Sequence, residues 1–121
     1  MVVNIFAAAS FLAVAAAPAH AANPQFQTPS SNIGCEYQAD SDDRLYCVRL
    51  EPEMSYIEFY EKGAYSGAYE GDAWFPSGAP VLKYGKSLII GPYTCTSQKS
   101  GLICKRGEHG FEANRKGITT Y

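Results

Sequence analysis

Four cysteines constrain the fold of this 121-residue chain more than any other feature of its sequence. They are Cys35, Cys47, Cys95 and Cys104. An even number of cysteines in a short chain indicates disulfides if the chain is exported, which the N-terminal segment described next predicts. Each sequential pair encloses a short segment with turn residues in its middle, so we predict the bridges Cys35–Cys47 and Cys95–Cys104. A zinc site is the alternative, but the spacings do not match the usual C-x₂₋₄-C knuckle. We therefore expect two disulfides and neither a metal nor another cofactor.

Residues 1–21 have the pattern of a secretory signal peptide. Ile5 to Ala17 is almost wholly apolar, and this run is too short to span a membrane. Pro18 ends the run, and the small residues of Ala19-His20-Ala21 favour cleavage after Ala21, with Ala22 as the rival position. The first four residues carry neither Lys nor Arg, which departs from the usual pattern. The leader and the cysteines together predict a secreted or periplasmic protein.

Export makes a direct prediction about the mature N-terminus. Mass spectrometry of the secreted protein is expected to show a chain that begins at Ala22 or Asn23, because a signal peptidase reads the small residues just before the cut. An intact Met1 on the folded protein would contradict the leader assignment.

The pattern of the remaining chain predicts an all-β domain. Short runs suited to strands alternate with Gly, Pro, Ser and Asp roughly every ten residues, and helical periodicity is almost absent. The clearest hairpin joins 93–97 to 102–106, a register in which Cys95 faces Cys104. Residues 56–60 fit either a strand or one helical turn, and Gly91-Pro92 predicts a bulge or an edge because Pro donates no ladder hydrogen bond. We expect a flexible lead-in over 22–29 and, over 30–121, one antiparallel sheet, barrel-like or sandwich domain built of hairpins.

Charge and hydropathy exclude two classes of partner. The net charge is −2, with both signs mixed along the chain, which is not the composition of a strongly basic nucleic-acid binder and gives no attraction to anionic membranes. No apolar run of about 18 residues follows position 22, so we expect no membrane span in the mature chain.

Residues 26–35, FQTPSSNIGC, resemble the opening of a domain of unknown function found in small secreted bacterial proteins. The usual form of that motif is F-x-S-P-S-G-N-I-x-C. The resemblance continues to the end of the chain, over 26–121, through short matches in the same order: Tyr46-Cys47, Gly71-Asp72, Leu82-Lys83-Tyr84-Gly85, Gly91 to Ser97, Gly101 to Cys104 and His109-Gly110-Phe111. It implies export and a disulfide-containing β fold, and it assigns no activity.

Two departures from the family pattern bear on the fold. Ser31 stands where the family usually has Gly, so the turn before Asn32 is expected to differ in φ. Members usually carry six cysteines, and the middle pair is missing here. One lost cysteine aligns with Tyr69, just before Gly71-Asp72. We expect the two cysteines of this pair to be lost together, because a single leftover thiol would be reactive in an oxidising compartment.

Candidate catalytic residues are few. His109 is the only His after the leader, and Glu108 and Glu112 would be the carboxylates that orient it as a general base. Gly107 and Gly110 instead favour a His in a turn whose ring bonds to the backbone. We therefore predict no catalytic residue and no enzyme activity.

Three acidic residues form the only candidate cation loop in the sequence. Asp40, Asp42 and Asp43 carry oxygen ligands, but the residues that follow supply none of the further ligands that an EF-hand loop needs. A solvated hairpin tip is the favoured interpretation.

Aromatic residues give the remaining functional signal. Tyr combines a flat apolar ring with a polar tip, which suits it to protein or sugar surfaces as well as to the core of a small β domain. Gly67, between Tyr65 and Tyr69, leaves a gap beside two rings where a ligand could approach the backbone. We predict a binding surface formed by Tyr65, Tyr69, Asp72 and Trp74.

These features favour a non-catalytic binding or structural module of the cell envelope or medium. Its expected partner is an envelope or extracellular protein or a glycan. The alternative is a secreted inhibitor of a hydrolase such as a muramidase or a protease, because small disulfide-bonded β domains present rigid loops well.

Overall fold

The computed structural model describes residues 23–72 and 74–121, and within them the chain forms strands and no helix. The expected signal peptide, 1–21, lies outside the described residues. Ten strands follow one another along the chain: β1 (Gln25–Gln27), β2 (Ile33–Gln38), β3 (Arg44–Arg49), β4 (Ser55–Tyr60), β5 (Gly63–Ala68), β6 (Ser87–Ile90), β7 (Tyr93–Gln98), β8 (Gly101–Arg106), β9 (His109–Asn114) and β10 (Gly117–Thr120). The predicted all-β class is confirmed. In the described part of the chain, no helix is long and apolar enough to cross a membrane.

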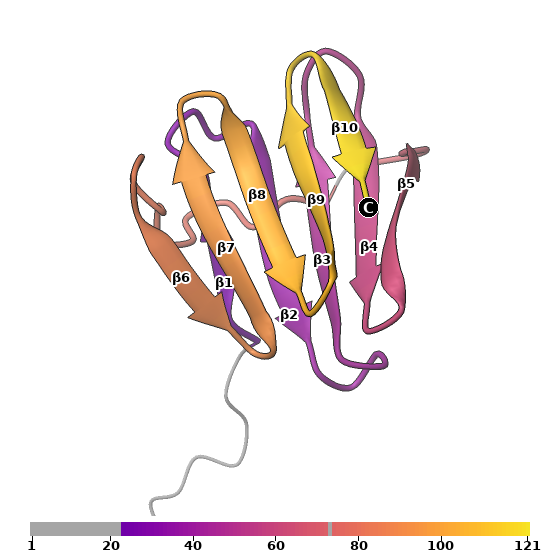
Figure 1. Cartoon of the computed structure of the whole chain (residues 1–121). Helices are drawn as coiled ribbons and strands as arrows, with labels where there is room; N and C mark the ends of the chain where they lie inside the picture. Colours follow the sequence, from indigo (N-terminus) through magenta and orange to yellow (C-terminus); the bar gives the residue numbers. More distant parts are fainter. Residues whose placement is uncertain (1–22, 73) are drawn as a thin grey trace, which may run out of the picture.

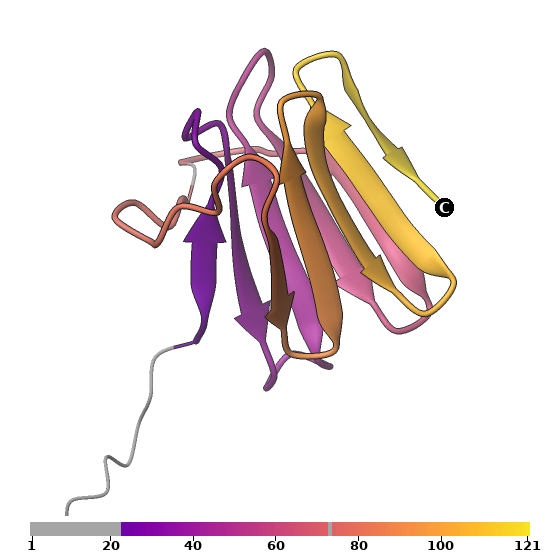
Figure 2. The same cartoon turned by 60° about the vertical axis from the view of Figure 1, so that its left-hand side comes forward.

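The strands form two antiparallel five-stranded sheets that pack face to face as a sandwich (Figure 1). The first sheet has the order β1-β2-β3-β4-β5 and the second the order β10-β9-β8-β7-β6, so each is a meander of consecutive hairpins. Strand β5 lies against β9 and β10, and the edge strands β1 and β6 bound the opposite side (Figure 2).

Each sheet carries one disulfide near its centre. Cys35 of β2 is the register partner of Cys47 of β3, and Cys95 of β7 is the register partner of Cys104 of β8. Their Cα atoms are 4.1 Å and 4.0 Å apart, and all four side chains are fully buried between the sheets. Both predicted pairs are confirmed, because the directly opposed residues of a hairpin bring their side chains to the same face.

An aromatic cluster joins the two sheets in the core. Phe59 of β4 lies with its ring centroid 4.8 Å from that of Tyr93 of β7 and 5.9 Å from that of Phe111 of β9. All three side chains are fully buried. The Tyr93 hydroxyl lies within hydrogen-bond distance of the backbone carbonyl of Asp43, at 2.7 Å, so its polar tip is satisfied where the rings end.

The long connection between β5 and β6 crosses the outer face of the first sheet (Figure 1). Gly34 of β2 allows this approach, because a Cβ at that position would lie 2.6 Å from the Pro76 ring. Val48 of β3 points to the same outer face and is nevertheless fully buried. The outer face of the first sheet is thus covered over β2 and β3, and the covering segment holds Trp74 and Phe75 against it.

Replacing Gly34 by Ala tests this cover. The added Cβ requires Pro76 to move, so we expect the free energy of unfolding to fall by about 1–3 kcal/mol. Urea denaturation measures the change. Gly117→Ala is the matched control: nothing lies within 4 Å of a Cβ there, and its stability is expected to stay level or rise. Equal stability of the two variants would contradict the close approach.

Four expectations from the sequence are corrected or resolved by the fold. The segment 56–60 belongs to a strand, β4. Gly91-Pro92 forms no bulge but the two-residue turn of the β6–β7 hairpin, with Gly91 at φ 57°, a conformation that glycine adopts easily. Ser31 keeps φ 59°, the region glycine favours, so the turn does not depart in φ from what Gly would adopt. The first sheet begins within the expected flexible lead-in, at β1, whose Phe26 is only 1% exposed.

Candidate functional site

The outer face of the first sheet carries most of the aromatic residues singled out from the sequence. Tyr65 of β5 is 55% exposed, and its ring centroid lies 6.4 Å from that of Tyr60. Gly67, however, leaves no open gap: a Cβ there would lie 2.6 Å from the Tyr56 hydroxyl, because the Tyr56 ring already fills the space. The prediction of a ligand gap at Gly67 is therefore wrong, and the packed residue is a tyrosine of the neighbouring strand.

Tyr69 and Trp74 meet at the start of the covering segment. The backbone N–H of Trp74 donates to the Tyr69 hydroxyl at 3.1 Å. The Trp74 ring lies against Tyr46 of β3, with the centroids 5.6 Å apart. Asp72 is exposed in the same segment. The structure thus brings Tyr69 and Trp74 together with Tyr46. Tyr65 lies two strands from Tyr46, in the row formed across the sheet by Tyr46, Glu58 and Tyr65.

A shallow depression of about 390 Å³ lies beside this contact. Its lining is unusually rich in tyrosines and carboxylates: Tyr46, Tyr56, Glu58, Ala68, Tyr69 and Glu70. We refer to Tyr46, Tyr56, Glu58, Tyr65, Tyr69, Glu70 and Trp74 as the tyrosine face. Tyr46, Tyr56 and Glu58 were missed in the sequence, although strict alternation with the buried Leu45, Cys47, Ile57 and Phe59 signals that they share the outer face.

Arg44 holds two members of the tyrosine face in place. Its Nη1 lies 2.8 Å from Glu58 Oε2 in a half-buried ion pair. Its guanidinium carbon also lies 4.8 Å from the centre of the Tyr46 ring. Tyr46 therefore contacts both a guanidinium and the Trp74 ring, and both contacts restrict its movement.

The surroundings of Tyr46 disfavour its ionised form. Burial, together with the neighbouring Tyr69, raises the pKa of Tyr46 from its ordinary value of 10.0 to about 12. The Tyr46 hydroxyl therefore stays neutral over a wider alkaline range than that of an ordinary tyrosine.

The raised pKa predicts a specific alkaline loss of stability. The unfolded chain releases the Tyr46 proton near pH 10 and the folded chain near pH 12, so the contribution is complete below pH 10 and is lost as the pH rises to 12. Denaturation curves at several pH values are expected to fall more steeply over this interval for the wild type than for Tyr46→Phe. Parallel curves would contradict the prediction.

The acidic hairpin tip, which contains Asp40, Asp42 and Asp43, makes contacts that stabilise the fold. The Asp43 carboxylate accepts a hydrogen bond from the Tyr37 hydroxyl at 2.6 Å, and its backbone carbonyl accepts one from Arg106 at 3.1 Å. Asp42 and Asp43 both have positive φ, which Asp tolerates in tight turns. Among the described residues, no group of three or more His, Cys, Asp and Glu is placed to hold a metal ion.

His109 lies at the same end of the sandwich, as the first residue of β9. It lines a shallow hollow with Glu61, Arg106 and Glu108. Within the described part of the chain its ring makes no hydrogen bond, so the structure does not reproduce the expected ring-to-backbone bond.

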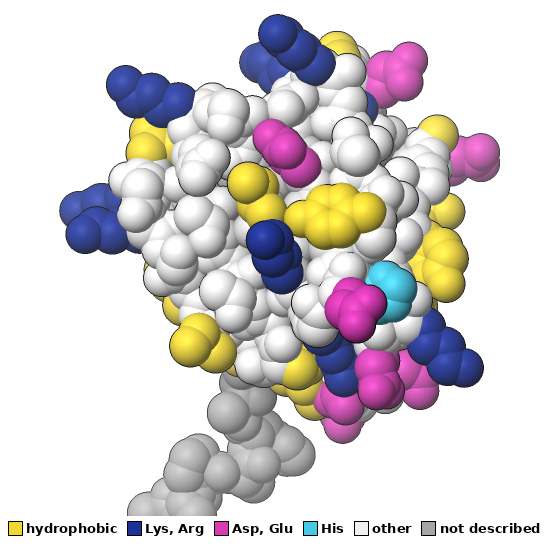
Figure 3. Space-filling view, viewed as in Figure 1, with side chains coloured by type: hydrophobic (Ala, Val, Ile, Leu, Met, Phe, Trp, Pro, Cys, Tyr) yellow, Lys and Arg dark blue, Asp and Glu magenta, His cyan; other side chains and the backbone are white. Residues whose placement is uncertain are grey.

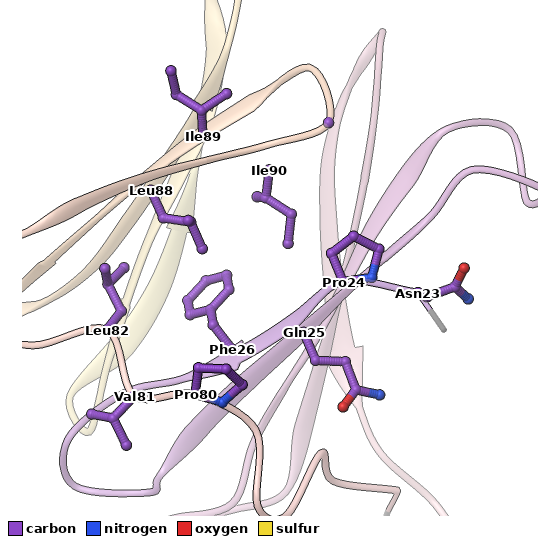
Figure 4. A pocket seen from close by; sticks show the side chains of 11 residues that line it. Asn23, Pro24, Gln25, Phe26, Pro80, Val81, Leu82, Leu88, Ile89 and Ile90 are labelled. Atoms are coloured by element: carbon purple, nitrogen blue, oxygen red, sulfur yellow. The ribbon is translucent and has the colours of Figure 1, made fainter. Parts of the chain in front are cut away.

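An apolar groove of about 520 Å³ opens where β1 and β6 bound the sandwich (Figure 4). Phe26, Leu88 and Ile90 converge on it from the two strands, whereas Ile89 points away and is 78% exposed. The segment 80–82 pairs with the free edge of β1 through a bridge between Gln27 and Val81. Sequence alternation alone did not reveal this groove, because its two walls come from different sheets.

Comparison of the chain with protein-family models, with curated proteins and with solved structures gives no match. Fold and surface chemistry therefore define the class: a small β-sandwich with two disulfides and a tyrosine-rich outer face.

Proposed function

We propose that this protein is an exported, non-catalytic binding module that uses the tyrosine face to hold a protein partner in the cell envelope or the medium. The observation that carries the proposal is the depression in which three tyrosines and two carboxylates converge beside Trp74. Tyr and Trp supply large contact areas at a low cost in side-chain entropy, and such residues dominate the energetics of protein interfaces.

The charge of the tyrosine face favours a partner with exposed Lys or Arg side chains. Glu70 and Asp72 are exposed at its rim. Tyrosine rings attract cations through their electron-rich faces, and carboxylates pair with them. Acidic residues at the rim would also steer a basic partner towards the face.

We also propose that the protein is secreted, that it is of bacterial origin and that it belongs to the family that its sequence resembles. Two buried disulfides in a small domain support an oxidising compartment. The positive φ of Ser31 supports the alignment with the family motif, because the family usually has Gly at that position.

Variants of the tyrosine face test the proposal. Affinity is measured for a partner recovered by cross-linking in the native culture, using the fluorescence of Trp74, the single Trp of the chain. Tyr65→Ala and Asp72→Ala are expected to lower the affinity with little change in the denaturation midpoint, and Trp74→Ala, followed by calorimetry, to lower it most. Tyr84→Ala, which removes an exposed tyrosine elsewhere, is the control. Large stability losses with unchanged affinity would show that these side chains stabilise the fold and do not bind the partner.

Inhibition of a secreted hydrolase is the second candidate function. It is supported by the covering segment, which Pro76 fixes against Gly34 so that the Trp74 loop is held on the sheet. A panel of muramidases and proteases separates the two functions: an inhibitor lowers the activity of one enzyme in a saturable manner, whereas a general binding module leaves all of them active.

A further inference from the structure

A small pocket lies between the two sheets at the end of the sandwich where β2 and β8 begin. Its volume is about 210 Å³. Residues of both sheets line it, among them Ser30, Tyr84, Gln98, Lys99 and Arg115. The lining contains two cationic side chains and no carboxylate.

Basic residues gather around this end of the second sheet. Lys99 lies in the β7–β8 turn, Arg115 and Lys116 lie in the β9–β10 turn, and Lys86 precedes β6; all four are exposed. Figure 3 shows Lys and Arg side chains along the top and upper left of the molecule, with Asp or Glu side chains beside them at the upper right, and a second group of Asp, Glu, His, Lys and Arg side chains at the other end. Glu51 and Glu53 lie in the β3–β4 loop at the same end. Neither forms an ion pair with these basic side chains, since the ion pair found among the described residues joins Arg44 and Glu58.

A buried arginine adds positive charge behind the pocket wall. Arg49 is only 6% exposed, and its guanidinium donates to neutral acceptors alone: the carbonyls of Asn114 and Glu53 and the Ser55 hydroxyl. Asn114 lines the pocket, as does Ile33, the cross-strand partner of Arg49. A guanidinium in such surroundings usually pairs with a carboxylate, because removing an uncompensated charge from water is costly.

Two buried polar atoms lack hydrogen-bond partners among the described residues, and both belong to this end. They are Arg49 Nε and Ser97 Oγ. Ser97 is the cross-strand partner of Leu102, which lines the pocket. Elsewhere in the described core, the buried polar side chains are satisfied. Neither Arg49 nor Ser97 lines the pocket itself, but each is paired across its sheet with a residue that does.

We propose that this pocket binds a small polyanion through its phosphate or carboxylate groups. Lys99 and Arg115 would pair with the anion at the rim, and the amide of Gln98 and the hydroxyl of Tyr84 are neutral groups placed to contribute hydrogen bonds. Buried Arg49 adds positive charge behind the wall, where its guanidinium donates to the carbonyl of Asn114, a residue that lines the pocket. The volume suits a molecule of about the size of citrate or pyrophosphate.

Nuclear magnetic resonance titration tests this inference with inorganic pyrophosphate and citrate as probes, at constant ionic strength. Saturable amide shifts are expected over 30–33, 98–102 and 113–115, and the stronger of the two probes identifies the anionic group preferred. Shifts that do not saturate, or that spread evenly over both ends of the sandwich, would overturn the site.

A charge-matched pair of variants completes the test. Lys99→Ala/Arg115→Ala removes two exposed charges and is expected to weaken binding at least tenfold. Lys62→Ala/Lys105→Ala removes two exposed charges away from the pocket and is expected to change the affinity less than twofold. Equal weakening of anion binding in both variants would show that binding depends on the total charge of the protein and not on this pocket. Asp72→Ala separates this site from the proposed partner face, since it should leave anion binding unchanged.

Discussion

Removing the Cys95–Cys104 bridge by Cys95→Ala/Cys104→Ala is expected to lower the free energy of unfolding by about 3 kcal/mol. The bridge closes a short loop within one hairpin, so its main effect is to restrict the unfolded chain. Alanine is chosen because both sulfurs are fully buried and a serine hydroxyl would have no water to bond. Chemical denaturation of the wild type and the variant, without reductant, measures the difference.

The Cys35→Ala/Cys47→Ala variant provides the comparison for this effect. Its loop is of similar length, so a loss of similar size is expected, and the combined variant should be unfolded or only marginally folded at 37 °C. Peptide mapping of the wild type without reduction should join the same two pairs and reveal no free thiol, in agreement with the structure. A loss below 1 kcal/mol for both variants would contradict the view that a domain of this size depends on its bridges.

Phe59→Ala is expected to destabilise the domain by about 3–5 kcal/mol, the largest effect of any single substitution considered. Phe59 is fully buried, and it contacts Tyr93 and Phe111 of the opposite sheet. Truncation therefore removes buried apolar surface from the first sheet and leaves a cavity that faces the second sheet. The change is measured by urea denaturation monitored by circular dichroism.

Two variants bracket this prediction. Phe59→Leu keeps most of the volume and should lose clearly less stability, which gives a measurable value if Phe59→Ala fails to fold. Ile89→Ala truncates a side chain that is 78% exposed and should change stability by less than about 0.5 kcal/mol. Similar losses for Phe59→Leu and Ile89→Ala would show that the sheets are not held together by this aromatic cluster.

The tyrosine face shows how far the sequence could identify a site. Tyr69 and Trp74 were found because they stand near glycines in a segment of unusual composition. Tyr46 and Tyr56 were missed because alternation along a strand shows that a residue faces outward, not what covers that face. The Tyr56 ring occupies the space beside Gly67, and this contact follows from strand pairing rather than from spacing along one strand.

The pocket proposed to bind a polyanion could not be found from the sequence. Lys99 and Arg115 belong to separate turns, and Arg49 and Ile33 belong to the other sheet. A net charge of −2 gives no sign of a local positive cluster. Only the stacking of the two sheets brings these residues together at one end of the sandwich.

The sequence by itself determined the all-β class, the two hairpins that carry the cysteines and both disulfide pairs. These features depend on contacts between residues close in the chain, where turn residues and the period-two pattern set which side chains face each other. The tertiary structure alone decided which faces meet, where the β5–β6 connection crosses, and which polar groups are buried without a partner. Those outcomes depend on packing between distant segments, because apolar surface can be buried in several arrangements and only close fit selects one of them.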